Sequence, residues 1–240
     1  MKGFVVLLVA VSCVLGLARP ASAQSGQTST SAASSVTSAQ PTITFQFDRT
    51  GLSVPRYMLV LHEDGSGTYH AEEVERKSAD SAVQQVSSKE IDRTLALSSE
   101  TTKKIFDMAQ SLNHFNLFCG TKAKNIADTG KKTLTYSSTE SNGSCTYNYS
   151  DDKNVMLLTE MLYAIAYTMD VGRRLDFERR FDHLGLDAEL IALEHSLEEK
   201  NALEVMNIAP TLTAIANNMD LMQRVRTRAA KLLEKNSATK

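Results

Sequence analysis

Two histidines on either side of a short turn are the residues of this chain whose types and spacing could carry chemistry. One hairpin register would bring His62 and His70 to the same face of a sheet, within diagonal reach of each other. Glu63 or Asp64 would then join them at a metal ion, or nearby carboxylates would act with them in the cleft of a hydrolase. The other register would send the imidazoles to opposite faces. We predict no metal site and no cofactor, because structural zinc sites usually show paired ligand spacings that this sequence lacks.

Two cysteines, Cys119 and Cys145, follow the N-terminal segment. We predict that they form a disulfide, because the chain begins with an export signal and extracytoplasmic compartments are oxidising. The alternative is a reactive thiol, which needs a neighbouring histidine or helix N-terminus to lower the pKa of the thiol. Neither stands beside these cysteines in the sequence, so the predicted role of both is structural.

Three tyrosines near the second predicted hairpin could form a surface on which a ligand stacks. Tyr147 and Tyr149 would share one strand face, with Tyr136 opposite them on the neighbouring strand. Cross-strand packing is the alternative, and aromatic residues usually stabilise sheets in that way. We assign no catalytic residue, because the chain also lacks a Walker loop, a dinucleotide fingerprint and a nucleophile elbow.

The N-terminal segment has the pattern of an export signal followed by a spacer. A charged Lys2, an apolar run over residues 4–17 and the sequence Ala-Ser-Ala at 21–23 predict a signal peptide at residues 1–23. The apolar run is shorter than the roughly 20 residues of a spanning helix, so we expect no stable membrane span after cleavage. Residues 24–41, rich in Ser and Thr, are predicted to be a disordered linker that serves as a tether or a plain spacer. The predicted location is extracytoplasmic, either periplasmic or secreted.

The charge balance disfavours nucleic acid as a partner. The chain has 26 basic and 28 acidic residues, and loss of Lys2 and Arg19 with the signal would lower the net charge from −2 to −4. A nucleic-acid-binding domain would be expected to show a clustered basic face.

Alternating residues predict strands that must position these side chains. Residues 42–47 alternate, and residues 57–61 lead into Asp64-Gly65, which is typical of a tight hairpin turn. The charged segment 72–85 either extends this hairpin or forms a ragged edge, and residues 91–97 alternate again. A second hairpin is predicted over residues 131–136 and 145–149, with its turn at Asn142-Gly143.

Helices are predicted after each group of strands. Ser98 and Ser99 are good N-cap residues for a first helix, and residues 150–152 for a second one that Gly172 would end. Residues 173–240 contain only helix candidates: one begins at Asp187, two flank Pro210, and the last covers residues 220–235.

The hairpin Y-M-L-V-L-H-E-D-G-S-G-T-Y at residues 57–69 resembles that of an uncharacterised domain of secreted bacterial proteins, in which a helix and a second hairpin follow. The similarity spans residues 42–170 and implies an exported domain with no assigned activity. The segment V-R-T-R-A-A-K-L-L-E at residues 225–234 is similar to the second helix of a HEAT-type repeat.

Together these patterns predict an α+β protein. An antiparallel sheet of hairpins with two packed amphipathic helices would occupy residues 42–172, and a small all-helical subdomain residues 173–240. The leading functional hypothesis is a non-catalytic binding or interaction module, with a protein partner on the C-terminal helices. The alternatives are an envelope-associated hydrolase that uses His62 and His70, and a purely structural envelope component.

Overall fold

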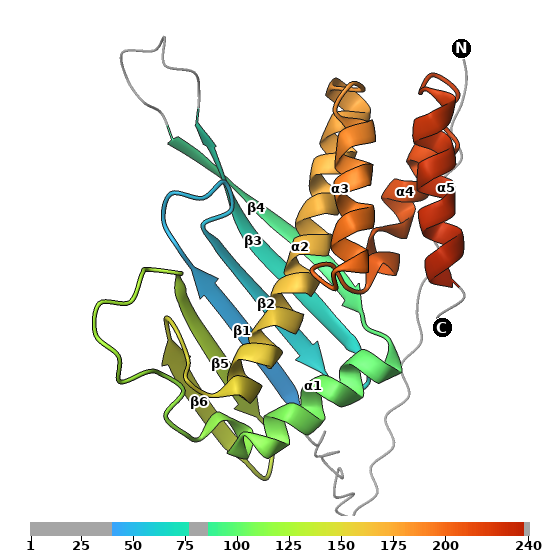
Figure 1. Ribbon diagram of the computed structural model, residues 1–240. Coiled ribbons are helices and arrows are strands. Elements are labelled where there is room, and N and C mark those ends of the chain that lie inside the picture. Colours follow the sequence, from blue (N-terminus) through green and yellow to red (C-terminus); the bar gives the residue numbers. More distant parts are fainter. Residues whose placement is uncertain (1–39, 77–85, 238–240) are drawn as a thin grey trace, which may run out of the picture. The chain divides into compact units, whose positions relative to one another are not determined.

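The computed structural model describes residues 40–76 and 86–237. The chain divides between Thr37 and Ser38, and all described residues belong to the second of its two units. The predicted signal peptide and nearly all of the predicted linker lie outside the described residues, so both stay predictions. Figure 1 shows the second unit as a sheet with helices beside it.

Six strands of the described residues form one antiparallel sheet. Their order across the sheet is β4-β3-β2-β1-β5-β6. The strands are β1 (Thr42–Asp48), β2 (Arg56–His62), β3 (Ser66–Arg76), β4 (Val86–Ala96), β5 (Lys131–Ser137) and β6 (Asn142–Tyr147). Ile43, Phe45 and Phe47 alternate along β1 and are buried, as their spacing predicts. The predicted α+β fold class is therefore confirmed, and β3 extends the first hairpin into the charged segment as far as Arg76.

The turn between β2 and β3 forms as its sequence predicts. Gly65 has a φ of +84°, and a Cβ atom there would lie 2.9 Å from the carbonyl oxygen of Leu97. Asp64 closes the turn, because its Oδ1 accepts hydrogen bonds from the backbone N–H (2.8 Å) and the hydroxyl (2.6 Å) of Ser66. These hydrogen bonds to the charged form lower the pKa of Asp64 to about 2.

The second hairpin has its turn earlier than the sequence predicts. The connection runs from Ser138 to Ser141, and the backbone N–H of Ser138 donates to the carbonyl oxygen of Ser141 at 3.0 Å. Asn142 and Gly143 already belong to β6. Gly143 serves close packing instead of chain reversal, because a Cβ atom there would lie 2.2 Å from the carbonyl oxygen of His114.

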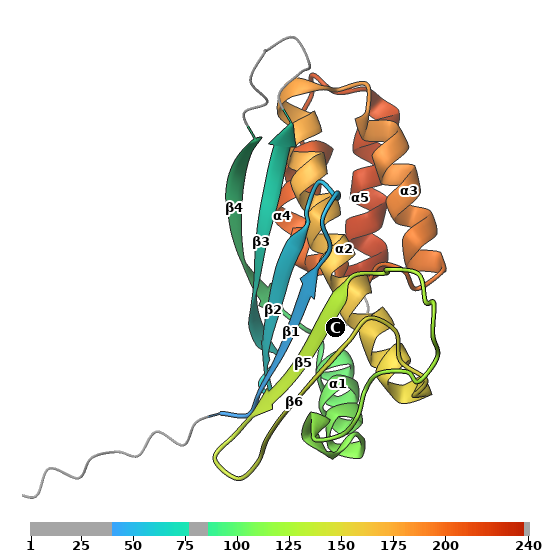
Figure 2. The ribbon, with the colours of Figure 1, turned by 90° about the vertical axis from the view of Figure 1, so that its left-hand side faces the viewer.

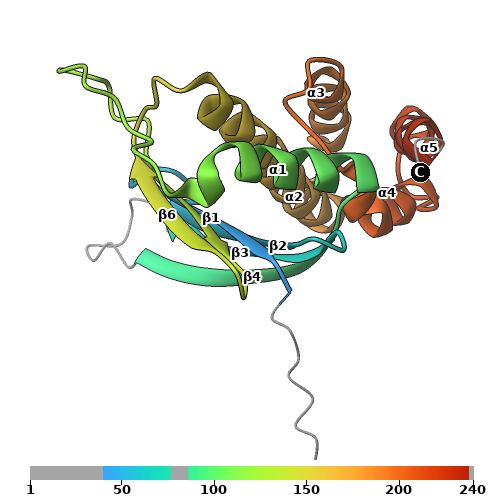
Figure 3. The ribbon, with the colours of Figure 1, turned by 90° about the horizontal axis from the view of Figure 1, so that it is seen from below.

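The two predicted amphipathic helices pack on the same face of the sheet (Figure 3). Helix α1 (Ser99–Ser111) begins at the N-cap Ser98, and a short 3-10 turn, η1 (Asn113–Phe115), follows it. Helix α2 (Lys153–Phe181) begins at Asp152, whose Oδ1 accepts the backbone N–H of Asn154 at 2.8 Å. The N-caps of both helices are therefore where the sequence places them.

Helix α2 does not end at Gly172, so that prediction is wrong. It continues to Phe181, and the predicted domain boundary at residues 172 and 173 falls inside it. The glycine is needed for packing, because a Cβ atom there would lie 2.3 Å from Cγ2 of Ile208. Among the described residues α2 is the one helix long and apolar enough to cross a membrane, but 67% of that apolar window is buried within the fold.

The C-terminal region is helical, as predicted. It contains α3 (Leu186–Glu198), the 3-10 turn η2 (Val205–Ile208), α4 (Ala209–Ala216) and α5 (Gln223–Ser237). Pro210 lies in the first turn of α4, where a missing backbone N–H costs no helical hydrogen bond. The last helix begins at Gln223, three residues later than expected.

Polar contacts join these helices to the sheet. Arg173 on α2 pairs with Glu73 on β3, and both Arg173 and Arg174 pair with Asp170. Farther along, the side-chain amide of Asn207 accepts the backbone N–H of Ala96 at 2.7 Å and donates to its carbonyl oxygen at 3.1 Å. The helical region and the sheet are thus joined by α2, which contacts both, and by these ion pairs and hydrogen bonds.

Candidate functional site

The helices cover one face of the sheet and leave the other uncovered by any described element (Figure 2). We call the uncovered side the outer face. The alternation of each strand sends the large apolar residues to the helices and sends polar residues, many of them threonines, to the outer face. A binding site for another molecule is therefore most accessible there.

A hollow of about 450 Å³ lies on the outer face and spans five of the six strands. We call it the outer-face hollow. Strand pairing builds it from two neighbouring rows of outward-pointing residues. The first row is Thr133, Gln46, Met58, His70 and Asp92, and the second is Lys131, Asp48, Arg56, Glu72 and Glu90. The hollow is within the range of volumes found for ligand sites.

The charges in the outer-face hollow are only partly paired with each other. Arg56 and Glu72 form an ion pair of 3.0 Å across β2 and β3. Asp48, Glu90 and Lys131, in contrast, make no ion pair with other residues that the structure describes. Unpaired charges of both signs beside the half-buried Met58 are available to a ligand that carries polar groups around an apolar part.

His70 is held between two partners on the outer face. Its Nδ1 contacts Oδ1 of Asp92, the opposite residue on β4, and its Nε2 lies 3.0 Å from the hydroxyl oxygen of Thr68. The order carboxylate, imidazole and hydroxyl is that of a hydrolytic triad. However, β3 is paired on both sides, so the ladders already occupy the backbone N–H groups that would otherwise act as oxyanion donors beside Thr68. The arrangement orients the imidazole without completing a site for acyl transfer.

His62 shares the outer face with His70 but lies far from it. Its Nδ1 is 3.2 Å from the hydroxyl oxygen of Thr42 on β1. The register pairs Leu61 with Gly67 and Met58 with His70, which separates the two histidines by about 13 Å along the sheet. Neither of the two registers considered for this hairpin is the one observed: the histidines share a face, but the turn between β2 and β3 is too short to bring them within diagonal contact. No described residues form a group of three or more metal-binding side chains.

Two of the three tyrosines pack in the interior, so the three do not form one surface on which a ligand could stack. Tyr136 is buried and packs on the ring of His114, with centroids 4.4 Å apart. Tyr147 is buried too, and its hydroxyl is 2.5 Å from that of Thr159 on α2. Only Tyr149, which follows β6, is exposed. The alternation of β5 and β6 points the first two inward, which agrees with the packing alternative.

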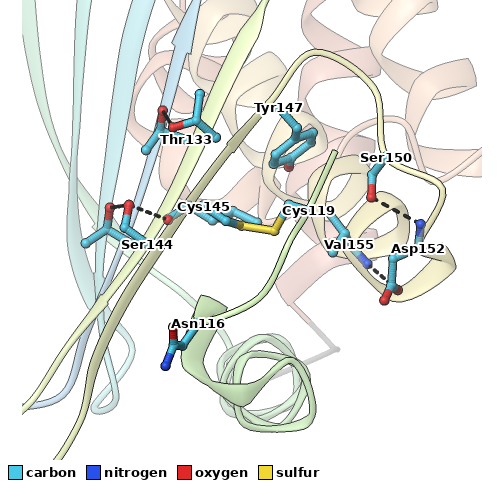
Figure 4. Close-up of a disulfide and its surroundings, with 12 residues drawn as sticks. Asn116, Cys119, Thr133, Ser144, Cys145, Tyr147, Ser150, Asp152 and Val155 are labelled. Atoms are coloured by element: carbon cyan, nitrogen blue, oxygen red, sulfur yellow. Dashed lines mark hydrogen bonds between the residues drawn. A yellow bond between two sulfur atoms is a disulfide. The ribbon is translucent and has the colours of Figure 1, made fainter. Parts of the chain in front are cut away.

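The predicted disulfide between Cys119 and Cys145 is present. Their Cα atoms are 5.8 Å apart, and both residues are buried. Figure 4 shows the bond between β6 and the segment that follows η1, with Tyr147 next to it along the strand. The bond fixes the long connection between α1 and β5 against the edge of the sheet, which is a structural role.

Sequence reasoning missed a buried lysine beneath the sheet. Lys132 points inward, and its Nζ donates to the carbonyl oxygens of Gly130 at 2.9 Å and of Asn148 at 2.6 Å. It also lies 5.9 Å from the ring centroids of Tyr147 and Tyr163. Desolvation lowers the pKa of Lys132 to about 8, although Asp128 opposes this. The sequence signal for the burial of Lys132 is its position two residues before Leu134 and four before Tyr136, in the series of β5 that alternation sends inward.

Comparison with models of protein families, with characterised proteins and with solved structures finds no match to this chain. What the resemblances at residues 57–69 and 225–234 imply about this chain therefore stays a prediction.

Proposed function

We propose that this protein is an exported, non-catalytic binding module whose ligand occupies the outer-face hollow. The observation that carries the proposal is the contrast between the two faces of the sheet. Helices α1 and α2 bury one face, whereas the other presents a hollow of about 450 Å³ lined by charged side chains from five strands. The hollow combines the half-buried Met58 with charged groups of both signs, which is the kind of lining that a ligand with polar groups around an apolar part requires.

Export is supported by two features of the chain. The disulfide between Cys119 and Cys145 is typical of oxidising compartments, and the N-terminal pattern is that of a signal peptide. The ligand would then come from the envelope or the medium. The lining suggests an organic molecule or peptide segment that carries charged groups of both signs, because Lys131 lies at one end of its row and Glu90 at the other.

Amide chemical-shift mapping tests this proposal. We expect zwitterionic dipeptides and amino sugars, added one at a time, to shift the amide signals of Met58, His70 and Asp92 in the ¹⁵N-labelled protein. Met58→Arg should abolish these shifts by filling the hollow. Val60→Arg is the matched control, because Val60 is on the same strand and face but does not line the hollow. Shifts that persist in Met58→Arg, or that map to other surfaces, would exclude this site.

A hydrolase is the second candidate, and the line from Asp92 through His70 to Thr68 favours it. In this reaction the hydroxyl of Thr68 would pass its proton to Nε2 of His70 and attack an ester carbonyl. The imidazolium would give that proton to the departing alkoxide as the ester C–O bond breaks, and water would then hydrolyse the acyl ester and restore the Thr68 hydroxyl. Turnover of p-nitrophenyl acetate that Thr68→Val removes and Thr68→Ser retains would favour the hydrolase. Equal rates in Thr68→Val and the unaltered protein would leave binding as the function.

A further inference from the structure

The sheet ends in two edge strands, β4 and β6. Strand β6 has six residues, whereas β4 has 11 and pairs with β3 without a break from Ala96 to Val86. Figure 2 shows β4 as the outermost strand on its side of the sheet. A long and regular edge strand is a template on which another strand can pair.

The backbone of β4 turns every second residue toward its free edge. The N–H of Leu97, just past the strand, donates to the carbonyl oxygen of Gly65 at 2.8 Å and so continues the ladder with β3. The backbone groups of Ala96 point the other way, because both bond to the side chain of Asn207. This direction alternates along an antiparallel strand. The other residues that turn their N–H and carbonyl groups to the free edge are therefore Ser88, Glu90, Asp92 and Thr94.

Asn207 imitates a further strand at one end of this edge. Its side-chain amide accepts the N–H of Ala96 at 2.7 Å and donates to the carbonyl oxygen of the same residue at 3.1 Å. A residue of a neighbouring strand makes the same two hydrogen bonds in a hydrogen-bonded antiparallel pair. Among the described residues, only β3 hydrogen-bonds to the backbone of residues 88–94. The fold thus caps the end of the edge and leaves the rest of it open.

The exposure of side chains along β4 agrees with an open edge. Residues 87–90 and 92–94 are exposed. Lys89 and Arg93 are among them, although alternation sends them to the helix side with the buried Ile91 and Leu95. The described helices therefore do not extend over the edge at these positions.

The two faces of β4 carry opposite charges at this edge. Glu90 and Asp92 lie on the outer face, whereas Lys89 and Arg93 lie on the helix side. Asp92 pairs with His70, and the other three form no ion pair with the residues that the structure describes. A strand with basic side chains toward the outer face and acidic side chains toward the helix side would complement all four charges.

The same charges disfavour a second copy of β4 as the partner. Two copies that extend the sheet across a two-fold axis pair antiparallel, and residues with outward backbone groups must then face each other. Every such register centred between residues 89 and 93 sets like charges directly opposite, namely Lys89, Glu90, Asp92 or Arg93 opposite itself, or Glu90 opposite Asp92. Like charges in this position are destabilising, and charged side chains commonly protect an edge strand from identical molecules. A chain of complementary charge meets no such barrier.

We propose that β4 binds an extended segment of another protein as an added antiparallel strand, with basic side chains on the outer face and acidic ones on the helix side. Main-chain hydrogen bonds to the free edge would supply the affinity, and the cross-strand charge pairs would select the partner. The inference does not rest on the ligand of the outer-face hollow, because it uses backbone groups in the plane of the sheet.

A synthetic peptide tests the pairing without any change to the protein. Acetylated and amidated Thr-Glu-Lys-Val-Lys-Glu-Thr has no net charge, and its lysines face Glu90 and Asp92 when its valine lies opposite Ile91. At millimolar concentration it should slow hydrogen exchange severalfold at the outward amides of residues 90, 92 and 94 in the ¹⁵N-labelled full chain. The amides of residues 91 and 93, already bonded to β3, should not change. Unchanged exchange at the outward amides would overturn the proposal.

Two methylated forms of the peptide are the matched controls. N-methylation of a lysine removes an N–H that faces β4 and should weaken binding roughly tenfold. N-methylation of the valine removes an N–H on the far side and should leave binding unchanged, because antiparallel pairing alternates the direction of these groups. Equal effects of the two modifications, or the reverse order, would contradict an added antiparallel strand.

The charge pairs are tested on the protein. Glu90→Lys should weaken binding of the unmodified peptide about threefold or more, because it replaces an attractive cross-strand pair by a repulsive one. Glu63→Lys is the control, since Glu63 is an exposed acid in the turn that precedes β3 and a neutral peptide feels little long-range attraction. Equal weakening in both variants would exclude pairing at β4.

Two further measurements separate this inference from other occupants. Met58→Arg, which fills the outer-face hollow, should leave the slowed exchange intact. Its loss would place the peptide in the hollow and overturn the proposal. The same amides should exchange at a constant rate when the protein alone is concentrated. Slower exchange at high protein concentration would show that β4 pairs with a second copy, which would also overturn it.

Discussion

At the scale of single residues, the unusual feature of the interior is a buried lysine, Lys132. Lys132 is a residue of β5 whose buried ammonium group donates to backbone carbonyl oxygens and to the hydroxyl of Thr129, and no carboxylate of the described residues forms an ion pair with it. Its ammonium group gives up water for neutral acceptors, and burial therefore disfavours the charged form. Any stabilisation that the lysine supplies by joining two loops must offset this cost, which depends on pH.

We predict that the effect of Lys132 on stability changes with pH. The pKa of this lysine is about 8 in the folded protein and 10.5 for the free side chain, so the folded state binds fewer protons between these values. The free energy of unfolding should therefore rise with pH from about 8 to about 10.5, relative to Lys132→Met. Urea unfolding of both proteins across this range measures the difference. The raised pKa values of Tyr147 and Tyr163 are common to both proteins, so they largely cancel. A constant difference would contradict the prediction.

At the scale of helices and strands, local sequence patterns were reliable where one residue fixes one backbone conformation. Asp64 and Gly65 predicted the first turn, and Ser98 predicted the start of α1. The same reasoning fails at Gly143, where it predicts a turn, and at Gly172, where it predicts the end of a helix. Both are glycines because another segment approaches their Cα atoms closely. The approaching residue is distant in the sequence, so no local pattern could reveal it.

We predict that Gly172→Ala destabilises the protein, although alanine favours helices by about 1 kcal/mol over glycine. The new methyl group would meet Cγ2 of Ile208, and overpacking of this kind costs about 1–3 kcal/mol. In the background of Ile208→Ala, which removes that atom, the same substitution should become neutral or stabilising. Denaturant unfolding of the four proteins measures the reversal. A stabilising effect of Gly172→Ala in the unaltered background would show that α2 and η2 are not closely packed.

The candidate site shows the same limit of sequence reasoning. The sequence identified His70, but its partner Asp92 is 22 residues away on β4 and belongs to it only through the register of the strands. The ten residues that face the hollow come from five strands, and apart from His70 each has the sequence pattern of an ordinary exposed strand residue. Alternation predicted that they point outward but not which of them lie side by side.

At the scale of the whole molecule, the sheet and the helical region are parts of one structure. Helix α2 packs on the sheet with its first half and on the later helices with its second. The ion pair between Arg173 and Glu73 and the amide of Asn207 add specific links between the two regions. We therefore expect both regions to unfold in one cooperative transition.

Asn207 offers a test of this coupling. Asn207→Leu would remove both hydrogen bonds to the exposed backbone of Ala96, which we expect to cost on the order of 1 kcal/mol because water can take the place of the amide. Asn201→Leu is the control, because that side chain only donates to exposed Glu199 nearby. Circular dichroism should show one lowered midpoint for Asn207→Leu at both strand and helix wavelengths. Separate midpoints would mean that the two regions unfold independently.

The continuity of α2 has a consequence for the ancestry of this chain. A recombination breakpoint at residues 172 and 173 would cut α2 and separate the half that covers the sheet from the half that packs on the later helices. A C-terminal segment that began at residue 173 would lack most of its first helix, so we expect it to fold only together with all of α2.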